Sequence, residues 1–313
     1  MSDDKPRLHT GTPIPHRLVT NVRNLARDDV TARWLESLPE TVADLCDRWE
    51  ITLDPIIPDT FITLVLLAHS AQLGPVVIKS SPLADEFRAE ATALGLAAGE
   101  NVARQYDVDL DRSVMVIERI VPGTQLRDVE MSDPAATRLA TETVATMWRP
   151  VADPSGLYPL RHWLRALLDW SPRREWIASD LIEEAQVLGR QLLARSTRSL
   201  LLHGDFQHHN LLRRSSGDWA IIDPKGLVGD PGFEIAAWMY NPPGVVERDD
   251  YVDVVKRRVE ICSEVWGFDR QDLIAWAFVG AVLSVCWSAD DLTPQGLLPY
   301  FERGARQLRT LLA

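Results

Sequence analysis

The sequence predicts an α+β protein with a small, strand-rich first part and a larger, mainly helical second part. Between residues 49 and 120, short apolar runs bounded by turn residues accompany a single helical segment. Beyond them, most segments carry helix start signals. We therefore expect an N-terminal extension or cap over residues 1–40, a small antiparallel sheet with one helix over 41–121, and a helical part over 122–313.

Local signals place the elements of the first part. One helix is expected around residues 28–38 of the extension. The apolar runs 75–79 and 113–120 indicate strands, and the second run stops at the turn residues 121–123. A serine N-cap and a first-turn proline predict a helix over residues 82–98.

The second part is predicted to be a series of helices. An Asp followed by a Pro opens the first helix, over residues 133–149. Further helices are expected over 159–170 and 179–195, and from near Pro231, Asp249, Asp269 and Leu297.

The segment 273–289 is the most apolar part of the chain and contains no charged residue. A membrane span needs about 20 residues, slightly more than this segment provides. It begins after Asp269 and Asp272, which form an acidic helix start, and it stops at Asp290. We therefore expect a buried helix and no membrane partner.

Composition and charge limit the class of protein. Of 313 residues, 46% are hydrophobic and 25% charged, as in a globular chain long enough for a two-lobed enzyme. The formal net charge of -12 argues against nucleic-acid binding, which favours basic patches. Cys46, Cys262 and Cys286 lie far apart, so we expect core thiols. Residues 1–5 form no apolar signal region, so the expected location is the cytoplasm.

A group of polar residues between short apolar runs has the spacing of a kinase catalytic loop. The pattern His-x-Asp-x-x-x-x-Asn begins at His203, and Asp223 follows the next apolar run. In kinase-type phosphoryl transfer an Asp accepts the proton of the attacking hydroxyl, while an Asn and a second Asp hold Mg²⁺. Asp205 is therefore the candidate catalytic base. Asn210 and Asp223 are the candidate magnesium ligands.

Two other interpretations of this segment remain open. His203, His208 and His209 are possible zinc ligands, although no further His, Cys or Asp follows at ligand spacing. Alternatively, the segment is a strand, a turn and a strand in which Asp and Asn serve only local hydrogen bonding, as they often do in turns.

The loop and the segment after it resemble the aminoglycoside phosphotransferase superfamily. The stretch from His203 to Asn210 and the segment 222–236, with its Asp-Pro-Lys-Gly-Leu-Val-Gly-Asp-Pro string, are similar to the streptomycin 6-phosphotransferase and hydroxyurea phosphotransferase branch. The resemblance extends from about Trp49 to the C-terminus. Upstream of the loop it rests on isolated positions. It implies a bilobal protein-kinase-like fold, a nucleotide-binding N-lobe, a helical C-lobe with the catalytic loop and acceptor site, and the use of ATP, or GTP, with Mg²⁺.

Lys79 ends a short apolar strand, as does the lysine that kinases present to the nucleotide phosphates. The following helix carries Glu86 and Glu90, one of which should pair with this lysine. The resemblance favours Glu90, because the string around it matches the helix of the family better. The alternative is that Lys79 is a strand-end lysine exposed to solvent.

The resemblance also places the purine contacts, but not a phosphate loop. It implies that the Glu118 carbonyl and the Ile120 amide bind the purine through the backbone. A glycine-rich loop is missing, since Gly74 is the only glycine between Trp49 and Lys79. The resembling family often has short polar residues in its place, which makes Asp59 and Thr60 candidates to approach the phosphates, although an acidic Asp59 is unfavourable there without a metal or a lysine.

Further residues near the loop have two possible roles each. In kinases the residue at the His203 position supports the loop by packing and hydrogen bonding. The family usually has an Asp where this chain has Glu234, which is one methylene longer and alters that support. Asp230 is either part of this support or the cap of the next helix. Lys225 either assists the transferred phosphoryl group or points to solvent.

The acceptor is marked by no motif. Residues on C-terminal segments that are candidates for lining its site are Trp238, Tyr240, Asp249, Asp250, Trp287 and Asp290. The leading hypothesis is ATP-dependent phosphorylation of a hydroxyl of a small polar molecule, such as the cationic aminocyclitol antibiotic streptomycin. The alternatives are a kinase of an unrelated metabolite (a sugar, a nucleoside or a hydroxyurea-like compound) and a catalytically silent nucleotide-binding protein of the same fold.

Overall fold

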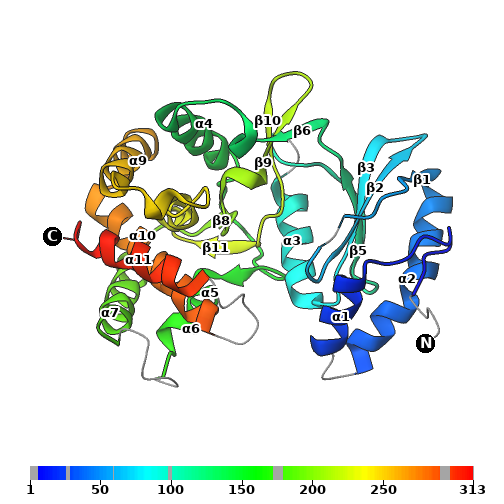
Figure 1. Ribbon diagram of the computed structural model, residues 1–313, viewed down its shortest axis with the longest axis horizontal. Coiled ribbons are helices and arrows are strands. Elements are labelled where there is room, and N and C mark those ends of the chain that lie inside the picture. Colours follow the sequence, from blue (N-terminus) through cyan, green and yellow to red (C-terminus); the bar gives the residue numbers. More distant parts are fainter. Residues whose placement is uncertain are drawn as a thin grey trace. The chain divides into compact units, whose positions relative to one another are not determined.

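The structure is a computed structural model, and it describes residues 6–25, 29–58, 60–97, 101–171, 179–289 and 297–312. The chain forms two compact units (Figure 1). The first unit consists of Met1–Gly123 with Arg214–Gly217, and the second of Thr124–Arg213 with Asp218–Ala313. Antiparallel strand pairs and abundant helices confirm the predicted α+β class.

The first unit is built on an antiparallel sheet in the order β1-β2-β3-β5-β4. Its strands are β1 (Ile51–Leu53), β2 (Leu64–Ser70), β3 (Gly74–Ser80), β4 (Gln105–Asp109) and β5 (Val114–Glu118). Successive side chains of a strand point to opposite faces of the sheet. On β3, Ile78 joins the hydrophobic cluster on one face, while Lys79 is directed to the other.

Helices cover both faces of this sheet. α1 (His16–Leu25) and α2 (Asp29–Arg48) lie on one face, and α3 (Ala84–Ala97) lies on the other (Figure 1). The helix predicted over residues 28–38 is the first half of α2. The predicted end of the extension, at residue 40, therefore falls inside a helix, and α1 is an element that the sequence did not predict.

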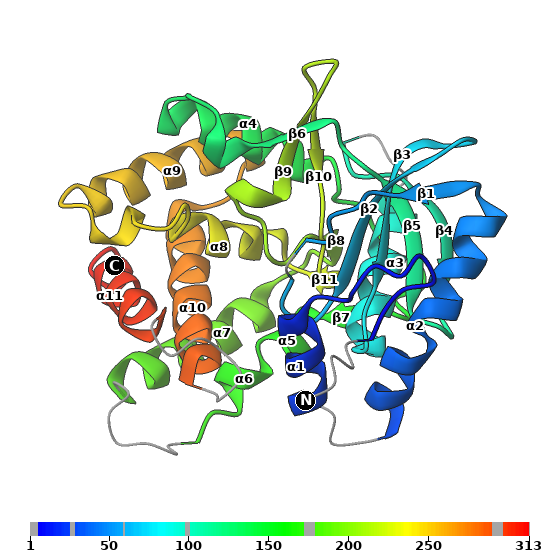
Figure 2. The ribbon, with the colours of Figure 1, turned by 45° about the vertical axis from the view of Figure 1, so that its right-hand side comes forward.

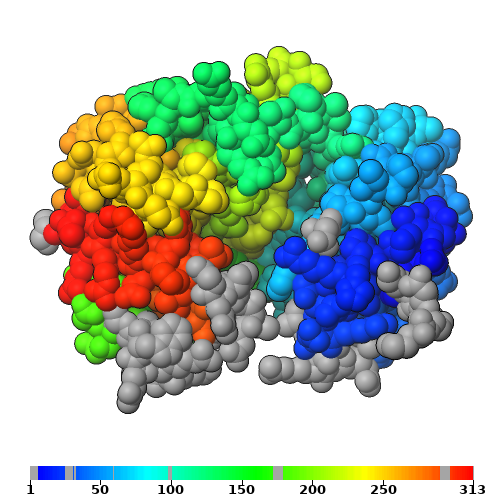
Figure 3. All heavy atoms as spheres, viewed as in Figure 1, coloured from blue at the N-terminus to red at the C-terminus, as the bar shows by residue number. Residues whose placement is uncertain are grey.

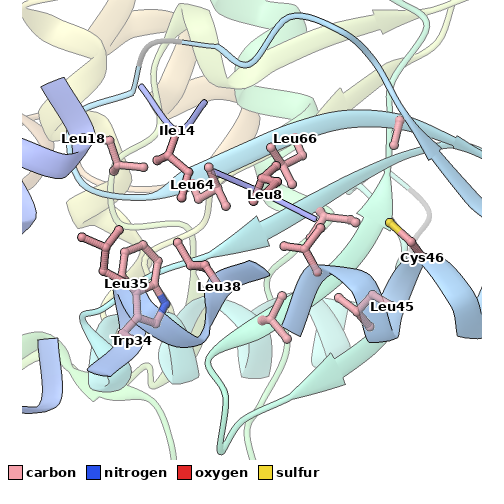
Figure 4. Close-up of a cluster of buried hydrophobic side chains, with 14 of the residues drawn as sticks. Leu8, Ile14, Leu18, Trp34, Leu35, Leu38, Leu45, Cys46, Leu64 and Leu66 are labelled. Atoms are coloured by element: carbon pink, nitrogen blue, oxygen red, sulfur yellow. The ribbon is translucent and has the colours of Figure 1, made fainter. Parts of the chain in front are cut away.

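A hydrophobic core joins α1 and α2 to the sheet (Figure 4). Leu18 of α1 and Leu38 and Leu45 of α2 are fully buried in one cluster with Leu64 and Leu66 of β2. Burying a leucine side chain contributes about 1.5 to 3 kcal/mol. The N-terminal helices are therefore part of the core of the first unit.

Two small sheets present the loops of the second unit. β8 (Leu200–Leu202) pairs antiparallel with β11 (Leu227–Gly229), which pairs in parallel with β7 (Tyr158–Pro159). β9 (Leu211–Arg214) and β10 (Trp219–Ile221) form a hairpin, and β6 (Pro122–Gln125) completes their sheet. The apolar runs predicted around the polar motif are therefore strands, and the polar residues lie in the connections between them.

The rest of the second unit is helical. The α-helices are α4 (Asp133–Ala145), α5 (Leu160–Trp163), α6 (Arg165–Leu168), α7 (Ser179–Arg195), α8 (Ile235–Met239), α9 (Tyr251–Trp266), α10 (Arg270–Ala289) and α11 (Leu298–Arg309). Short 3-10 helices are η1 (Leu126–Asp128), η2 (His208–Asn210), η3 (Pro231–Glu234) and η4 (Val245–Glu247). Figure 3 shows α9 in yellow and α11 in red side by side on one face of this unit.

α10 is the apolar helix that the sequence predicts. The Asp269 carboxylate caps its start by accepting hydrogen bonds from the backbone N–H groups of Gln271 and Asp272, at 2.8 and 3.1 Å. Within the described residues, α10 is the one helix long and apolar enough to cross a membrane, but 89% of its apolar window is buried. It packs against α7, α8, α9 and α11 (Figure 2), so it is the core helix of this unit.

Two helices of the second unit differ from the prediction. α4 ends at Ala145 rather than near Arg149. Beyond Ala145, the backbone N–H groups of Thr146, Met147 and Trp148 donate to carbonyls three residues earlier, so the chain continues as a tighter turn. The segment 159–170 is also not one helix, because α5 and α6 are separated at Leu164.

Candidate active site

The polar loop starts directly after β8 with a turn that only glycine can make. Gly204 has a φ of 84°, in the left-handed region. A Cβ atom at this position would lie 2.6 Å from the Leu227 side chain, which is closer than two non-bonded carbon atoms approach each other. Because Leu227 is paired with Leu202 across the β8–β11 ladder, the sheet itself enforces the close approach. The glycine therefore lets Asp205 follow the strand without displacing the sheet.

His203 is a fully buried residue that joins three parts of this loop. Its Nδ1 accepts the backbone N–H of Asp205 at 3.1 Å, so the ring proton lies on Nε2. That nitrogen donates to the Ile222 carbonyl at 2.9 Å. Burial lowers the pKa of His203 to about 4, so the ring is neutral. His203 thereby ties the loop to the segment that carries Asp223.

Asp205 is held at both its backbone and its side chain. The Asn210 side chain donates from Nδ2 to the Asp205 carbonyl at 2.9 Å. Gln207 donates from Nε2 to Oδ1 of the Asp205 carboxylate, also at 2.9 Å. Sequence reasoning missed Gln207, because a Gln two residues beyond an Asp carries no signal of its own.

Glu234 supports the loop from η3. Its Oε1 accepts the backbone N–H of His203 at 2.5 Å, and its Oε2 accepts that of Gly204 at 3.1 Å. Burial raises the pKa of Glu234 to about 7, in opposition to these two hydrogen bonds, which favour the carboxylate. Glu234, although one methylene longer than the Asp usual in the family, thus reaches the backbone of the loop with both of its oxygens.

Asp230 caps η3, as one of the two sequence interpretations predicts. Its Oδ1 accepts the backbone N–H of Gly232 at 2.8 Å. A Cβ on Gly232 would lie 2.7 Å from the ring of Trp276 on α10. The cap and this close packing fix the start of η3, and with it the position of Glu234.

The β9–β10 hairpin brings Asn210 and Asp223 to the same end of a ladder. Leu211 is paired with Ile221, and the backbone N–H of Ile222 donates to the Asn210 carbonyl at 3.0 Å. Asp223 then has a φ of 63°, a left-handed conformation that is uncommon for a residue other than glycine. One candidate magnesium ligand, Asn210, therefore directly precedes β9, and the other, Asp223, lies two residues beyond the end of β10.

Lys225 is engaged with the polar loop. Its backbone N–H donates to the His203 carbonyl at 2.7 Å, and its Nζ forms an ion pair with Oδ2 of Asp223 at 2.8 Å. The ammonium group thus lies beside a candidate magnesium ligand. Lys225 therefore does not simply point to solvent.

In the first unit, Lys79 forms a partly buried ion pair with Glu90. Its Nζ lies 2.5 Å from Oε1 of Glu90, and both side chains are only 12% exposed. The structure therefore pairs the strand lysine with the glutamate that the resemblance favours. Glu86, one turn earlier on α3, is exposed.

Glu118 and Ile120 lie at the end of β5. The Arg214 guanidinium binds both carboxylate oxygens of Glu118, at 3.0 and 2.8 Å, and the backbone N–H of Arg104 donates to one of them. Burial opposes ionisation, but these donors lower the pKa of Glu118. Ile120 is buried. Arg214 is a contact that sequence reasoning missed, because it lies 96 residues from its partner.

The candidate acceptor residues differ in their surroundings. Trp238 is buried, and its ring stacks on His208 with centroids 3.8 Å apart, so it is a core residue. Tyr240 is half-buried, and its hydroxyl accepts a hydrogen bond from Ser284 at 3.1 Å. Asp249 and Asp250 are exposed.

One aromatic candidate is part of a cluster near β7. Trp287 packs edge-on against Trp163, with centroids 5.3 Å apart, and Trp163 lies 6.3 Å from Tyr158. Asp290 and Asp59 lie outside the described residues. Among the described residues, no group of three or more His, Cys, Asp or Glu side chains is placed to hold a metal, so the zinc interpretation gains no support.

The sequence of this chain is similar to those of antibiotic-modifying kinases. It is 30% identical over 269 residues to streptomycin 6-kinase of Streptomyces glaucescens, covering 82% of this chain and 85% of the relative. It is 26% identical over 268 residues to hydroxyurea phosphotransferase of Kitasatospora aureofaciens, covering 82% and 75%.

Solved structures share the fold. One is choline kinase LicA from Streptococcus pneumoniae, with a TM-score of 0.61 at 13% identity, covering 87% of this chain and 99% of that one. Another is a thermostable mutant of aminoglycoside phosphotransferase APH(4)-Ia in a ternary complex with ADP and hygromycin B, with a TM-score of 0.58 at 14% identity, covering 86% and 97%. The bilobal kinase-like fold is therefore confirmed.

The sequence model described as aminoglycoside/hydroxyurea antibiotic resistance kinase matches residues 48–292. This range includes the Lys79–Glu90 pair, the loop with Asp205 and the support from Glu234. The chain therefore belongs to the aminoglycoside/hydroxyurea antibiotic resistance kinase family.

Proposed function

We propose that this protein transfers the γ-phosphate of ATP to a hydroxyl group of an aminocyclitol of the streptomycin type, with Asp205 as catalytic base. Family membership makes the chain a small-molecule phosphotransferase. The observation that carries the residue assignment is the way in which Asp205 is held. His203 and Asn210 fix its backbone, and Gln207 fixes its carboxylate.

Asp205 is suited to receive the proton of the acceptor hydroxyl. One carboxylate oxygen, Oδ1, accepts from Gln207, which orients the group about its Cβ–Cγ bond. A general base must lie within hydrogen-bond reach of the proton that it removes, so a fixed orientation increases the fraction of productive encounters. Gln207 supplies this orientation, while the buried His203 holds the backbone of Asp205.

Asn210 and Asp223 fit a magnesium ion. The Nδ2 of Asn210 is used in the bond to the Asp205 carbonyl, which leaves the amide oxygen as the end available to a cation. Carboxylate and amide oxygens are the hard ligands that Mg²⁺ prefers, with waters completing its shell. When bound, Mg²⁺ neutralises charge on the nucleotide phosphates. Lys225 pairs with Asp223 and thereby limits the negative charge of this end of the hairpin.

Lys79 is proposed to bind the phosphates of ATP. Its partly buried pair with Glu90 restricts the lysine to one position on β3, as in kinases where the lysine and the helix glutamate form a pair. The backbone of Glu118 and Ile120 is proposed to bind the purine. ATP use is supported by the kinase-like fold, which binds ADP in the solved APH(4)-Ia complex. ATP is a cytoplasmic substrate, and the buried free thiols suit the same compartment.

The acceptor is assigned from the relatives and from the character of this chain. Streptomycin kinases are among the similar proteins, and a net charge of -12 favours a cationic acceptor. The Trp163–Trp287 pair supplies aromatic faces of the kind that attract cations. Hydroxyurea is the second candidate acceptor, because a hydroxyurea phosphotransferase is 26% identical.

The test is a phosphotransfer assay with a matched pair of variants. The protein is incubated with Mg²⁺ and ATP or GTP, and with streptomycin, hydroxyurea, hygromycin B, sugars or nucleosides. ADP or GDP formation and the mass of the product are measured. Asp205→Asn should lower kcat about 100- to 10,000-fold. Asp218→Asn, an exposed carboxylate on the same hairpin, should leave kcat within about twofold.

The alternative functions give different results in the same assay. Turnover of a sugar or nucleoside with no turnover of streptomycin or hydroxyurea would identify a metabolite kinase. Magnesium-dependent nucleotide binding without transfer to any acceptor would identify a silent nucleotide-binding protein. Undiminished transfer by Asp205→Asn would remove the assignment of the base.

A further inference from the structure

The segment before the family match forms a defined layer of the first unit. We refer to the described residues 6–25 and 29–47 as the N-terminal cap. Its helices bury apolar side chains against β2, as Figure 4 shows for Leu18 and Leu38 beside Leu64. Leu8 and Ile14, which both precede α1, are buried in the same cluster. This layer is therefore part of the fold of the first unit.

The cap holds the connection between β1 and β2 through Phe61. The Asn21 side chain on α1 donates from Nδ2 to the Phe61 carbonyl at 2.8 Å. The Arg17 guanidinium, one turn earlier on α1, lies 5.7 Å from the centre of the Phe61 ring. α1 therefore contacts both the backbone and the side chain of one residue of this connection.

A second contact reaches the end of β3. Trp34 of α2 donates from its indole Nε1 to the hydroxyl of Ser80 at 3.0 Å, and this hydroxyl donates to the Ser113 carbonyl at 2.8 Å. Ser80 directly follows Lys79 and is paired with Leu64, the first residue of β2. The cap therefore contacts the strand next to the lysine as well as the connection that leads into β2.

The connection between β1 and β2, described over residues 54–58 and 60–63, is held in part by the sheet, because Ile57 and Ile62 pack against the core cluster. It contains no glycine, so it is not a glycine-rich phosphate loop. At its start, Asp54 is anchored by an ion pair with Arg119 at 2.8 Å. Further along, Ile56 is 77% exposed and Phe61 is 46% exposed, so neither is anchored in the core.

We propose that the N-terminal cap positions the nucleotide-binding elements of its own lobe, with Asn21 setting the β1–β2 connection and Trp34 setting the end of β3 that carries Lys79. The inference rests on the proposed function, because it concerns how the lobe binds ATP. Asn21 and Trp34 are positioning residues that act through Phe61 and Ser80. A connection without glycines that is fixed from outside loses less conformational freedom when phosphates bind to it.

The experiment compares two asparagines of one helix. Asn21→Ala removes the bond to Phe61, and Asn24→Ala removes an exposed side chain one turn later on α1. Binding of Mg²⁺ with a non-hydrolysable ATP analogue is measured by calorimetry, so no acceptor is needed. Loss of one such hydrogen bond should weaken binding by Asn21→Ala about two- to tenfold, with no change for Asn24→Ala.

Trp34→Phe provides a second, independent variant. It keeps an aromatic ring in the core but cannot donate to Ser80. The KM for ATP should rise about two- to tenfold for Asn21→Ala and Trp34→Phe, while the KM for the acceptor stays that of the wild type. Thermal unfolding is followed in parallel for all three variants.

Failure of this inference and failure of the proposed function are distinguishable. If the wild type binds the nucleotide analogue and both variants bind it as tightly as Asn24→Ala, the cap has no positioning role. A lower Tm with unchanged nucleotide affinity has the same meaning, since the cap would then serve stability alone. If the wild type itself binds no nucleotide, the proposed function fails and this inference fails with it.

Discussion

Glu234 and His203 are joined by a hydrogen bond of 2.5 Å, in which the buried carboxylate accepts the backbone N–H of the first residue of the polar loop. The second oxygen of Glu234 accepts the N–H of Gly204. The side chain of His203 binds the Ile222 carbonyl at the same time. The loop that carries Asp205 is therefore fastened on two sides by residues that lie far from it in the sequence.

The first prediction concerns Glu234→Gln. The amide has one acceptor oxygen, so one of the two backbone N–H groups loses its partner, and we expect kcat to fall about tenfold. In the wild type, burial raises the pKa of Glu234 to about 7. Protonation below this pH removes acceptor strength, so wild-type kcat should decline as the pH falls below 7. The variant should lack this step in its pH–rate profile from pH 6 to 9.

The same pKa shift has an opposite effect on stability. Because the folded pKa of Glu234 lies above its usual value of 4.5, the folded state holds a proton that the unfolded state releases between pH 4.5 and 7. The contribution of Glu234 to stability therefore decreases as the pH rises through this window, and Glu234→Gln should not show that decrease. Glu264→Gln, at a side chain that is 52% exposed, is the control. Identical profiles for Glu234→Gln and wild type would contradict the prediction.

The second prediction concerns the ion pair of the first unit. Lys79→Met should lower kcat/KM for ATP at least 100-fold, because the positive charge proposed to bind the phosphates is lost. Glu90→Gln should lower it about tenfold, and the double variant should be no worse than Lys79→Met, since Glu90 acts through the lysine. Steady-state kinetics with varied ATP measure both effects. Asp85→Asn, at an exposed carboxylate of α3, is the control, and a loss equal to that of Glu90→Gln would mean that the pairing is irrelevant.

The third prediction concerns Gln207→Ala. It removes the donor that orients the Asp205 carboxylate, so kcat should fall about five- to fiftyfold while the KM values for ATP and acceptor change little. Initial rates at saturating substrates provide the measurement. Gln271→Ala, at an exposed side chain, should be neutral. A rise in KM without a loss in kcat would show that Gln207 serves binding and not the orientation of the base.

The fourth prediction concerns His208, which stacks on Trp238 in the core. Burial, with a smaller effect of Arg258, lowers the pKa of His208 from 6.5 to about 3. Below pH 6.5 the unfolded state gains a proton that the folded state does not, so stability is lost as the pH falls. Between pH 7.5 and pH 5 this loss amounts to about 2 kcal/mol for His208.

His208→Phe keeps the stacking and removes the titration. Urea unfolding at pH 7.5 and pH 5 should show that the variant loses about 2 kcal/mol less stability than the wild type over this interval. His69→Gln, exposed on β2, should behave as the wild type. An equal loss for wild type and His208→Phe would mean that His208 does not resist protonation in the folded state.

Features that depend on neighbouring residues were predictable. The strands around the loop, α7 and the capped start of α10 follow from apolar runs, turn residues and N-cap residues that lie close together in the chain. The candidate catalytic residues were found for the same reason, because the spacing from His203 to Asn210 is set within one loop. In contrast, α1 was missed although Leu18, Val19 and Val22 recur at helical spacing, because the surrounding segment is polar and contains prolines.

Contacts over long sequence separations were not predictable in the same way. Glu86 and Glu90 are four residues apart and lie on one face of a helix, so periodicity cannot choose between them. The position of α3 on the sheet decides for Glu90. The contact of Arg214 with Glu118 and that of Asn21 with Phe61 likewise require strands and helices to be assembled first.

The sequence by itself determined the class of fold, the reaction type and the residues of the polar loop, because each is encoded by residue types at short, fixed spacing. Only the tertiary structure decided which side chains hold those residues in place. The resemblance named Glu234 as a support of the loop, but the structure decided that its two oxygens accept from His203 and Gly204. Trp34 reaches Ser80 across 46 positions, and no motif marked that contact. Such distances in space are fixed by the packing of whole elements against one another, and no local pattern in the sequence specifies them.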